Sequence, residues 1–251
     1  MKIIKYRKKN KGIYNVELDN GKTLALYEDT ILKFNLLLSK EIFEKDLNSI
    51  NLYNLECEVY YVALNCIKNR FRSEFELRSL LEKKEYPEEY IDKAINRLLK
   101  DGYLNDREFA RSYINNQMVT TNHGPHRIEK DLFDKKIDSN IISDEISLFS
   151  EEEQIDRINK LIVKKIKINH SRGGSVLKQK IFNDLKLLGY DSYIINKILN
   201  NYDFSNDDEL AEREYNKLYR RLSRKYSGDE LDRRIKQGLY QKGLKYEKKE
   251  N

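Results

Sequence analysis

The chain has 251 residues, of which 39% are hydrophobic and 36% are charged, with only 2 Pro and 10 Gly. This composition is too polar for one large compact core, but it is normal for a thin array of helices. The formal net charge of +6 is modestly basic, so it is compatible with an acidic partner without requiring one.

The N-terminal part differs from the rest in its hydrophobic pattern. Tyr14, Val16 and Leu18 alternate at period two, and the alternation resumes after Asn20-Gly21. Asn-Gly between alternating runs predicts a hairpin in which both turn residues have positive φ. The expected elements are strands at about 2–6, 13–18 and 22–27, a helix over 28–38 and a polar linker over 39–54. Six early cations belong either to a solvated strand edge or to a phosphate contact: Lys2, Lys5, Arg7, Lys8, Lys9 and Lys11.

One apolar frame then occurs four times, the last copy being cut short. It begins as Leu77-x3-Leu81-x4-Tyr86, and its first residue returns at Ile128, Ile181 and Ile235, at offsets of 51, 53 and 54 residues. Apolar residues four apart share a helix face, and the step of five marks a turn. Near-constant periods of this size indicate stacked helical repeats. The predicted fold is mainly α, an elongated tandem array of three-helix modules with at least nine helices, preceded by a small three-strand segment.

Capping signals divide the array into modules. Ser73-x2-Glu76, Asn105-x2-Glu108 and Ser150-x2-Glu153 each predict the start of a helix, because a side-chain oxygen can accept from the amide three residues on. Leu81, Leu132 and Leu185 are expected in equivalent buried positions. The predicted domains are residues 1–54 (N-terminal segment), 55–104, 105–149 and 150–204 (modules 1 to 3), and 205–251 (truncated module 4 with a basic tail).

Several segments of the modules resemble one family. Gly102-Tyr103-Leu104-Asn105-Asp106-x2-Phe109-Ala110 resembles the Gly-Tyr-Leu-Asp-Asp-x2-Phe-Ala signature of the RecX family. Gly124-x2-Arg127-Ile128-x3-Leu132 resembles the family's second-module pattern, and Arg72-Ser73-x2-Glu76-Leu77 resembles its first-module pattern. The resemblance covers about residues 59–244, and the N-terminal strands are similar to the extension of long Gram-positive members.

This resemblance implies a regulator of the RecA recombinase, usually an inhibitor of its filament on single-stranded DNA. The expected partners are the RecA nucleoprotein filament and single-stranded, or also double-stranded, DNA, and the expected state is a monomer. The chain departs from the family at one position. Members carry Gly before the apolar residue that follows the second helix, as at Gly189 and Gly243, whereas modules 1 and 2 have Glu85 and Lys136. The geometry of those two turns is left open.

No residue group points to catalysis. His123-x2-His126 lacks further ligands at usable spacing, and no nucleophile–base pair or Gly-rich phosphate loop is present. We therefore expect no enzyme, metal or cofactor. Cys57 and Cys66 lie about 13 Å apart by helical rise on one predicted helix, too far for a disulfide, and their number indicates a reducing compartment. Without a signal peptide or a membrane-spanning apolar run, we expect a cytoplasmic protein with no membrane association.

Cations supply the strongest functional signal. Residues 160–180 hold seven Lys or Arg and no acid, and residues 213–250 hold thirteen basic and six acidic residues. The stretch between the first and second helices carries cations in every module, including His126 and His170, so stacking would align them in one track. Such cations can neutralise phosphates or meet an acidic protein surface. The candidates are Arg70, Arg72, Arg127, Lys164, Lys165, Lys167, Arg172, Lys217, Arg220, Arg221, Arg224 and Lys225.

Three functions remain open. The first is a RecX-like regulator that lies along the RecA filament on single-stranded DNA. The second is a stand-alone DNA-binding protein with a helix-turn-helix-like pair over residues 77–99, although acidic residues occupy positions where a recognition helix needs cations: Glu82, Glu85, Glu88 and Glu89. The third is a protein-interaction scaffold, which predicts no affinity for DNA.

Overall fold

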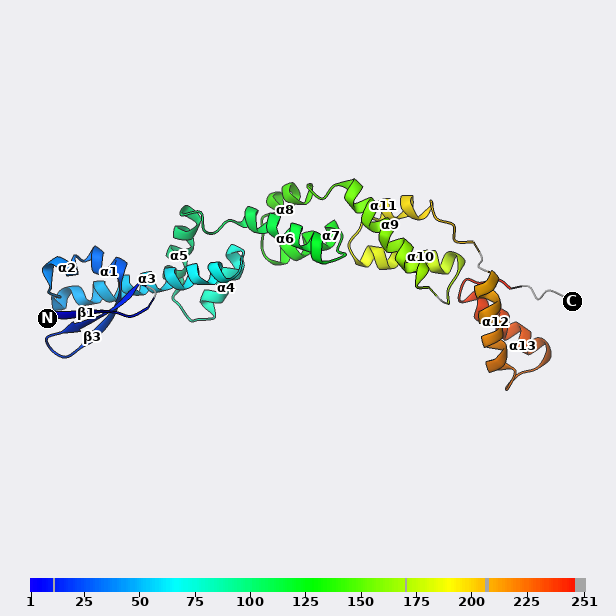
Figure 1. Cartoon of the computed structure of the whole chain (residues 1–251), viewed down its shortest axis with the longest axis horizontal. Helices are drawn as coiled ribbons and strands as arrows, with labels where there is room; N and C mark the ends of the chain where they lie inside the picture. Colours follow the sequence, from blue (N-terminus) through cyan, green and yellow to red (C-terminus); the bar gives the residue numbers. More distant parts are fainter. Residues whose placement is uncertain (11, 170, 206–207, 247–251) are drawn as a thin grey trace. The chain divides into compact units, whose positions relative to one another are not determined.

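The structure, a computed structural model, describes residues 1–10, 12–169, 171–205 and 208–246. The chain forms two compact units, one of Met1–Ala110 with Lys135–Ile141 and one of Arg111–Asp134 with Ile142–Asn251. Figure 1 gives the order of the elements along the chain. Lys11 and His170, which the sequence singled out, lie outside the described residues.

The N-terminal segment is a three-stranded antiparallel sheet in the order β1 (Ile3–Lys8), β2 (Ile13–Leu18), β3 (Thr23–Tyr27), as predicted. The Asn-Gly hairpin between β2 and β3 is confirmed, but positive φ at both turn residues is wrong. Gly21 alone has positive φ, +79°, and its N–H donates to the Leu18 carbonyl at 3.0 Å. This is a type I turn followed by a glycine bulge, which needs only one left-handed residue.

The predicted linker is wrong for residues 44–54, which form the start of the long helix α3 (Glu44–Asn69). Ile50 is buried in the core under the sheet. The Asn54 side chain satisfies the edge of β3, accepting from the Tyr27 N–H at 2.8 Å and donating to the Ala25 carbonyl at 3.0 Å. Polar residues here therefore belong to a helix that covers a sheet edge. The predicted helix over 28–38 is two short ones, α1 (Glu28–Lys33) and α2 (Leu36–Ser39), separated by left-handed Asn35.

The rest of the chain is a series of three-helix modules, as predicted, and the prediction of at least nine helices is met within the described residues. Leu81, Leu132 and Leu185 are each 0% exposed. Ser73 Oγ and Ser150 Oγ accept from the amides three residues on at 3.1 and 3.2 Å, which confirms these caps. Module 1 has α3, α4 (Glu74–Glu82) and α5 (Glu88–Lys100), and module 2 has α6 (Asp106–Thr120), α7 (Pro125–Asp134) and α8 (Ser139–Ile146). Module 3 has α9 (Glu151–Lys167), α10 (Gly174–Leu187) and α11 (Ser192–Leu199), and module 4 has α12 (Asp208–Leu222) and α13 (Gly228–Tyr240).

Each module turns after its second helix through one left-handed residue. Gly189 and Gly243 have φ of +92° and +71°, and the turns that the sequence left open have the same geometry, with Glu85 at +62° and Lys136 at +60°. A residue with a Cβ is disfavoured in this region by about 1–2 kcal/mol. The first two modules therefore keep the turn at a cost in backbone strain.

The same contact connects each module to the next. Gly124, before α7, donates its N–H to the Leu188 carbonyl at 2.7 Å, and Gly173, before α10, donates to the Lys242 carbonyl at 2.9 Å. In the first pair, the Ser73 hydroxyl donates to Lys135 O at 3.3 Å. In every case the residue that caps the second helix of one module meets the carbonyl just before the left-handed residue of the next. We call this contact the module joint.

Glycine lets two of the joints close tightly. A Cβ at Gly124 would lie 2.6 Å from the Gly189 oxygen, and a Cβ at Gly189 would lie 2.4 Å from the Arg127 nitrogen. Between modules 2 and 3 there is a second contact. Arg157 of α9 donates hydrogen bonds to Met118 O and, at 3.4 Å, to Thr121 O at the end of α6. These carbonyls lack a partner within their own helix, so the arginine acts as a cap supplied by the neighbouring module.

We expect Leu185→Ala to lower the free energy of unfolding by about 2–5 kcal/mol, as truncations of buried leucine do. Leu187→Ala is the matched control, because Leu187 on the same helix is 79% exposed and its loss should change stability by no more than about 0.5 kcal/mol. Urea unfolding followed by circular dichroism measures both. Equal losses of stability in the two variants would contradict the burial of Leu185 in the core of module 3.

We also expect Gly189→Ala to destabilise the protein more than Gly102→Ala. Both glycines have positive φ, but a Cβ at Gly102 meets nothing within 4 Å. Gly102→Ala therefore carries only the backbone penalty, about 1–2 kcal/mol, whereas Gly189→Ala also forces the joint apart, at about 1–3 kcal/mol more. Thermal unfolding of the two variants gives the difference, and a smaller loss for Gly189→Ala would argue against the joint.

Candidate functional site

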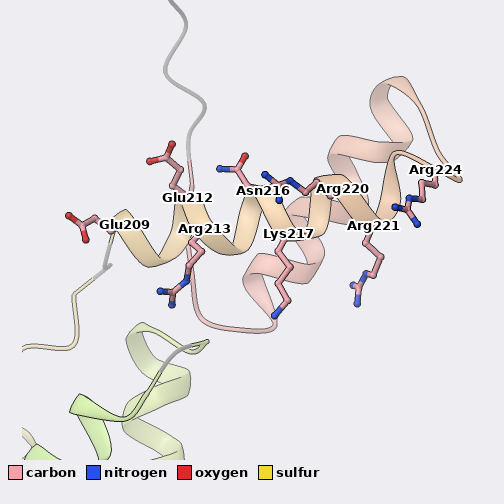
Figure 2. A pocket seen from close by; sticks show the side chains of 8 residues that line it. All are labelled: Glu209, Glu212, Arg213, Asn216, Lys217, Arg220, Arg221 and Arg224. Atoms are coloured by element: carbon pink, nitrogen blue, oxygen red, sulfur yellow. The ribbon is translucent and has the colours of Figure 1, made fainter.

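A group of five exposed cations lies on one face of α12 and in the turn that follows it. Leu210, Ala211 and Leu218 are buried on the inner side of the helix. The outer side carries five cations spaced by one to four residues, and Figure 2 shows them projecting from the helix together with Asn216 and two glutamates near its start. The cations are Arg213, Lys217, Arg220, Arg221 and Arg224. We call them the α12 cation face.

The members of this face differ in their partners. Lys217 Nζ lies 3.8 Å from an oxygen of Glu214. Within the described chain, no carboxylate oxygen lies within 4.0 Å of Arg220, Arg221 or Arg224. Guanidinium groups present paired donors in a planar fork that matches phosphate and carboxylate oxygens. These three arginines are therefore the best placed to bind an anion.

Glu214 fastens this helix to the rest of module 4. Its side chain is 3% exposed, and it pairs with the ammonium of Lys242, whose carbonyl takes part in the joint with module 3. Burial by itself would raise the pKa of the Glu214 carboxyl, but the hydrogen bond and charge of Lys242 outweigh it, so the pKa lies below its usual value. The inner face of α12 is thus set by an ion pair as well as by leucines.

Module 3 supplies a smaller set of free cations than the sequence suggested. Lys164 and Lys167 are exposed on α9. Lys165 pairs with Asp184 of α10 at 2.6 Å and is 27% exposed. Arg172 is half-buried in a loop that its N–H helps to close by donating to Asn169 Oδ1 at 3.2 Å. Lys165 is therefore engaged in holding the module together through its charge, whereas Arg172 takes part in the loop through its backbone.

The prediction that the cations of module 2 lie in the loop between its first and second helices is wrong. His126 and Arg127 lie inside α7 and not in a loop, and Arg127 pairs with Asp131 at 3.3 Å. In module 1, Arg70 is exposed at the end of α3, whereas Arg72 is half-buried and donates to the Cys66 carbonyl at 3.3 Å. In module 4, Lys225 is exposed beside Arg224. The sequence pattern did not distinguish exposed cations from those that hold the fold.

Other kinds of site find little support in the described residues. No group of three His, Cys, Asp or Glu side chains among them is arranged to hold a metal ion, and no described helix is both long and apolar enough to cross a membrane. Cys57 and Cys66 lie on α3 as free thiols. Burial raises the pKa of the Cys57 thiol, which lowers its reactivity.

Comparison with known families gives two matches. The family model described as "RecX, first three-helix domain" matches residues 60–98, and "RecX, second three-helix domain" matches residues 105–145. A protein named Regulatory protein RecX from Streptococcus sanguinis is 32% identical over 251 residues, covering 98% of this chain and 96% of the relative. One of the same name from Listeria welshimeri is 30% identical over 248 residues, covering 97% of this chain and 92% of the relative.

Two solved structures are also similar. One, titled "Crystal structure of regulatory protein RecX", has a TM-score of 0.69 and 27% identity, covering 78% of this chain and 98% of that one. The other, RecX from Lactobacillus salivarius, has a TM-score of 0.57 and 28% identity, covering 59% of this chain and 97% of that one.

The low pKa of Glu214 predicts how stability depends on pH. A carboxyl with a lowered pKa in the folded state contributes stability above its ordinary value of 4.5, and this contribution is lost as pH falls through the folded-state pKa. We expect Glu214→Gln to be less stable than the unmodified chain at pH 7 and the difference to shrink at pH 3. Chemical unfolding at both values measures it. A difference independent of pH would show that the ion pair contributes nothing.

Proposed function

Because the chain belongs to the RecX family, we propose that it regulates the RecA recombinase by binding along the RecA filament on single-stranded DNA, and that the result is inhibition. The observation that carries this proposal is the match over 98% of the chain to a protein named as a regulator, which includes all four modules and the N-terminal sheet. RecA as the target follows from the family name, and inhibition follows from what is usual for the family.

The repeated construction of the chain suits a repetitive partner. Modules that recur every 51 to 54 residues and meet through the same joint can present equivalent surfaces to successive subunits of a filament. Binding at one module raises the effective concentration of the next module near its own site. Several weak contacts can thus add up to firm binding.

The α12 cation face supplies the electrostatic part of this binding. Arg220, Arg221 and Arg224 can neutralise phosphates without reading bases, and Lys164 and Lys167 can contribute as point charges. Occupying the groove of the filament with these groups would exclude an incoming duplex, which carries the same negative charge. That competition gives a physical route to inhibition.

The helix-turn-helix alternative has less support. Glu82, Glu85, Glu88 and Glu89 are all exposed on and between α4 and α5. Four carboxylates at this pair oppose its insertion into a DNA groove. A protein-interaction scaffold remains as an outcome of the experiment below, because it predicts no dependence on the exposed cations.

The test is RecA ATPase on single-stranded DNA and strand exchange, each with and without this protein at two salt concentrations. Three double variants change the net charge equally: Arg220→Glu/Arg224→Glu on the α12 face, Lys164→Glu/Lys167→Glu on α9, and the control Arg233→Glu/Lys236→Glu on the exposed side of α13. We expect inhibition to weaken most for the α12 pair, with the salt slope of binding falling by about 0.7 per lost phosphate contact.

The control pair should leave inhibition nearly unchanged. Equal weakening by all three pairs would mean that only net charge matters and would remove the α12 face from the proposal. Unchanged inhibition by all three would favour contacts to RecA that do not use these cations. No effect of the unmodified protein on RecA would overturn the proposed function itself.

A further inference from the structure

The module joint has two sides, a cap side and a turn side. In the described chain, one cap side and one turn side take part in no joint. The cap side consists of the residue before a second helix and the first turn of that helix. The turn side consists of the left-handed residue after a second helix and its neighbours. Three joints use the cap sides of modules 1 to 3 and the turn sides of modules 2 to 4. The cap side of module 4, at Ser227, and the turn side of module 1, at Glu85, have no such partner among the described residues.

Burial follows the same division. Ser73, Gly124 and Gly173 are buried at the three joints, whereas Ser227 is exposed. On the turn side, the apolar residue after the left-handed one is 2–3% exposed in modules 2 to 4, namely Ile137, Tyr190 and Leu244. Tyr86, at the same position in module 1, is only half-buried, and Lys84 and Glu85 before it are exposed. Two accessible surfaces therefore stand where the other modules are covered.

The two surfaces also match each other chemically, in the way that the joint between modules 1 and 2 does. In that joint Ser73 donates to the Lys135 carbonyl, and the Lys135 ammonium pairs with Glu76, three residues after the serine. The accessible cap side has Ser227 followed three residues later by Glu230. The accessible turn side has Lys84 directly before its left-handed residue, as Lys135 directly precedes Lys136.

The steric requirement is met as well. The joint between modules 1 and 2 combines a serine cap with a left-handed residue that carries a Cβ, Lys136, so this version of the contact does not need glycine. Ser227 and Glu85 are the same pairing of a serine with a left-handed residue that carries a Cβ. Unlike Ser73, Ser227 does not cap its helix and is followed by left-handed Gly228, with φ of +59°. The Ser227 side chain makes no hydrogen bond within its own helix, so its hydroxyl is available to donate. Asp229 and Glu230 in the first turn of α13 carry charge opposite to that of Lys83 and Lys84. Glu230 pairs with Arg234 of its own helix at 3.1 Å, so the contact between copies would compete with this exposed ion pair.

We propose that module 4 of one copy docks on module 1 of a second copy through a fourth module joint, head to tail. Such a contact joins two different surfaces, so it leaves a free cap side at one end and a free turn side at the other. Further copies can then add in the same direction. The Ser227 hydroxyl would donate to the Lys84 carbonyl, and Glu230 would pair with the Lys84 ammonium of the neighbouring copy.

One bond of the internal joint is missing between copies. Where modules 1 and 2 meet, Asp106 Oδ1 accepts from the Glu74 N–H at 2.8 Å. The residue of module 1 equivalent to Asp106, 51 positions earlier, is Leu55, whose side chain cannot accept a hydrogen bond. The contact between copies is therefore weaker, which agrees with a monomer at low concentration. Copies aligned on a filament would be held at high effective concentration; only this last step depends on the proposed function.

Crosslinking between variants with one accessible cysteine each tests the contact, since the remaining Cys57 is buried. In a Cys66→Ser background, Lys84→Cys and Glu230→Cys are prepared as separate full-length proteins, mixed and oxidised, alone and with RecA on single-stranded DNA. We expect a dimer in the mixture and much less in either protein by itself. The control replaces Glu230→Cys by Lys236→Cys, an exposed position two turns along α13, and should give little product. Absence of the 84–230 product from both samples, or equal product with the control, would overturn the joint.

Charge reversal gives a second readout. Glu230→Lys and Lys84→Glu should each weaken self-association in sedimentation velocity several-fold, and the two changes in one chain should restore it. Failure of the double variant to restore association would contradict the Glu230–Lys84 pair, and unchanged melting would show that all variants are folded. Crosslinking without an effect on RecA would leave the joint standing and overturn the proposed function. Inhibition of RecA without crosslinking would overturn the joint alone.

Discussion

The hydrogen bond from the cap of one module's second helix to the turn of the next is the contact on which this architecture depends. A helix N-terminus has amides with no partner inside the helix, and a left-handed turn directs a carbonyl outward. At two joints a backbone amide donates to such a carbonyl, and between modules 1 and 2 the Ser73 hydroxyl is the donor. Because the acceptor is a backbone carbonyl at all three joints and the donor is either a backbone amide or a serine hydroxyl, the contact tolerates large changes in sequence, provided that the backbones can approach. Serine or glycine at the cap and a left-handed residue in the turn meet that condition.

Charged side chains also help to hold the modules together. Many Lys and Arg side chains are committed to the fold: Lys165 holds Asp184, Lys242 holds the buried Glu214, and Arg157 caps the end of α6. On α12 and in the turn after it, Arg220, Arg221 and Arg224 are exposed and have no carboxylate oxygen within 4.0 Å in the described part of the chain. These three arginines can bind a polyanion without weakening the module beneath them, because none of them pairs with a carboxylate of the described chain.

Some of the candidate site was accessible from sequence, and some was not. The spacing of Lys217, Arg220, Arg221 and Arg224 places them on one helix face by periodicity alone. Nothing in the spacing shows that Lys165 meets Asp184 on another helix or that Arg72 reaches back to the Cys66 carbonyl. Arg157 was missed because its role depends on the end of a helix 36 residues earlier. A lone arginine in an amphipathic helix carries no sequence signal of such a contact.

The sequence by itself determined the repeat, the three-helix modules, the caps at Ser73 and Ser150 and the hairpin at Gly21, because each depends on residues close together in the chain. Only the tertiary structure decided that residues 44–54 are helical, since that depends on Ile50 packing beneath a sheet and Asn54 reaching its edge. It also decided that Glu85 and Lys136 take the left-handed turn. Local preference disfavours that conformation, but contacts elsewhere in the module, including the buried Ile137 after Lys136, outweigh a strain of about 1–2 kcal/mol.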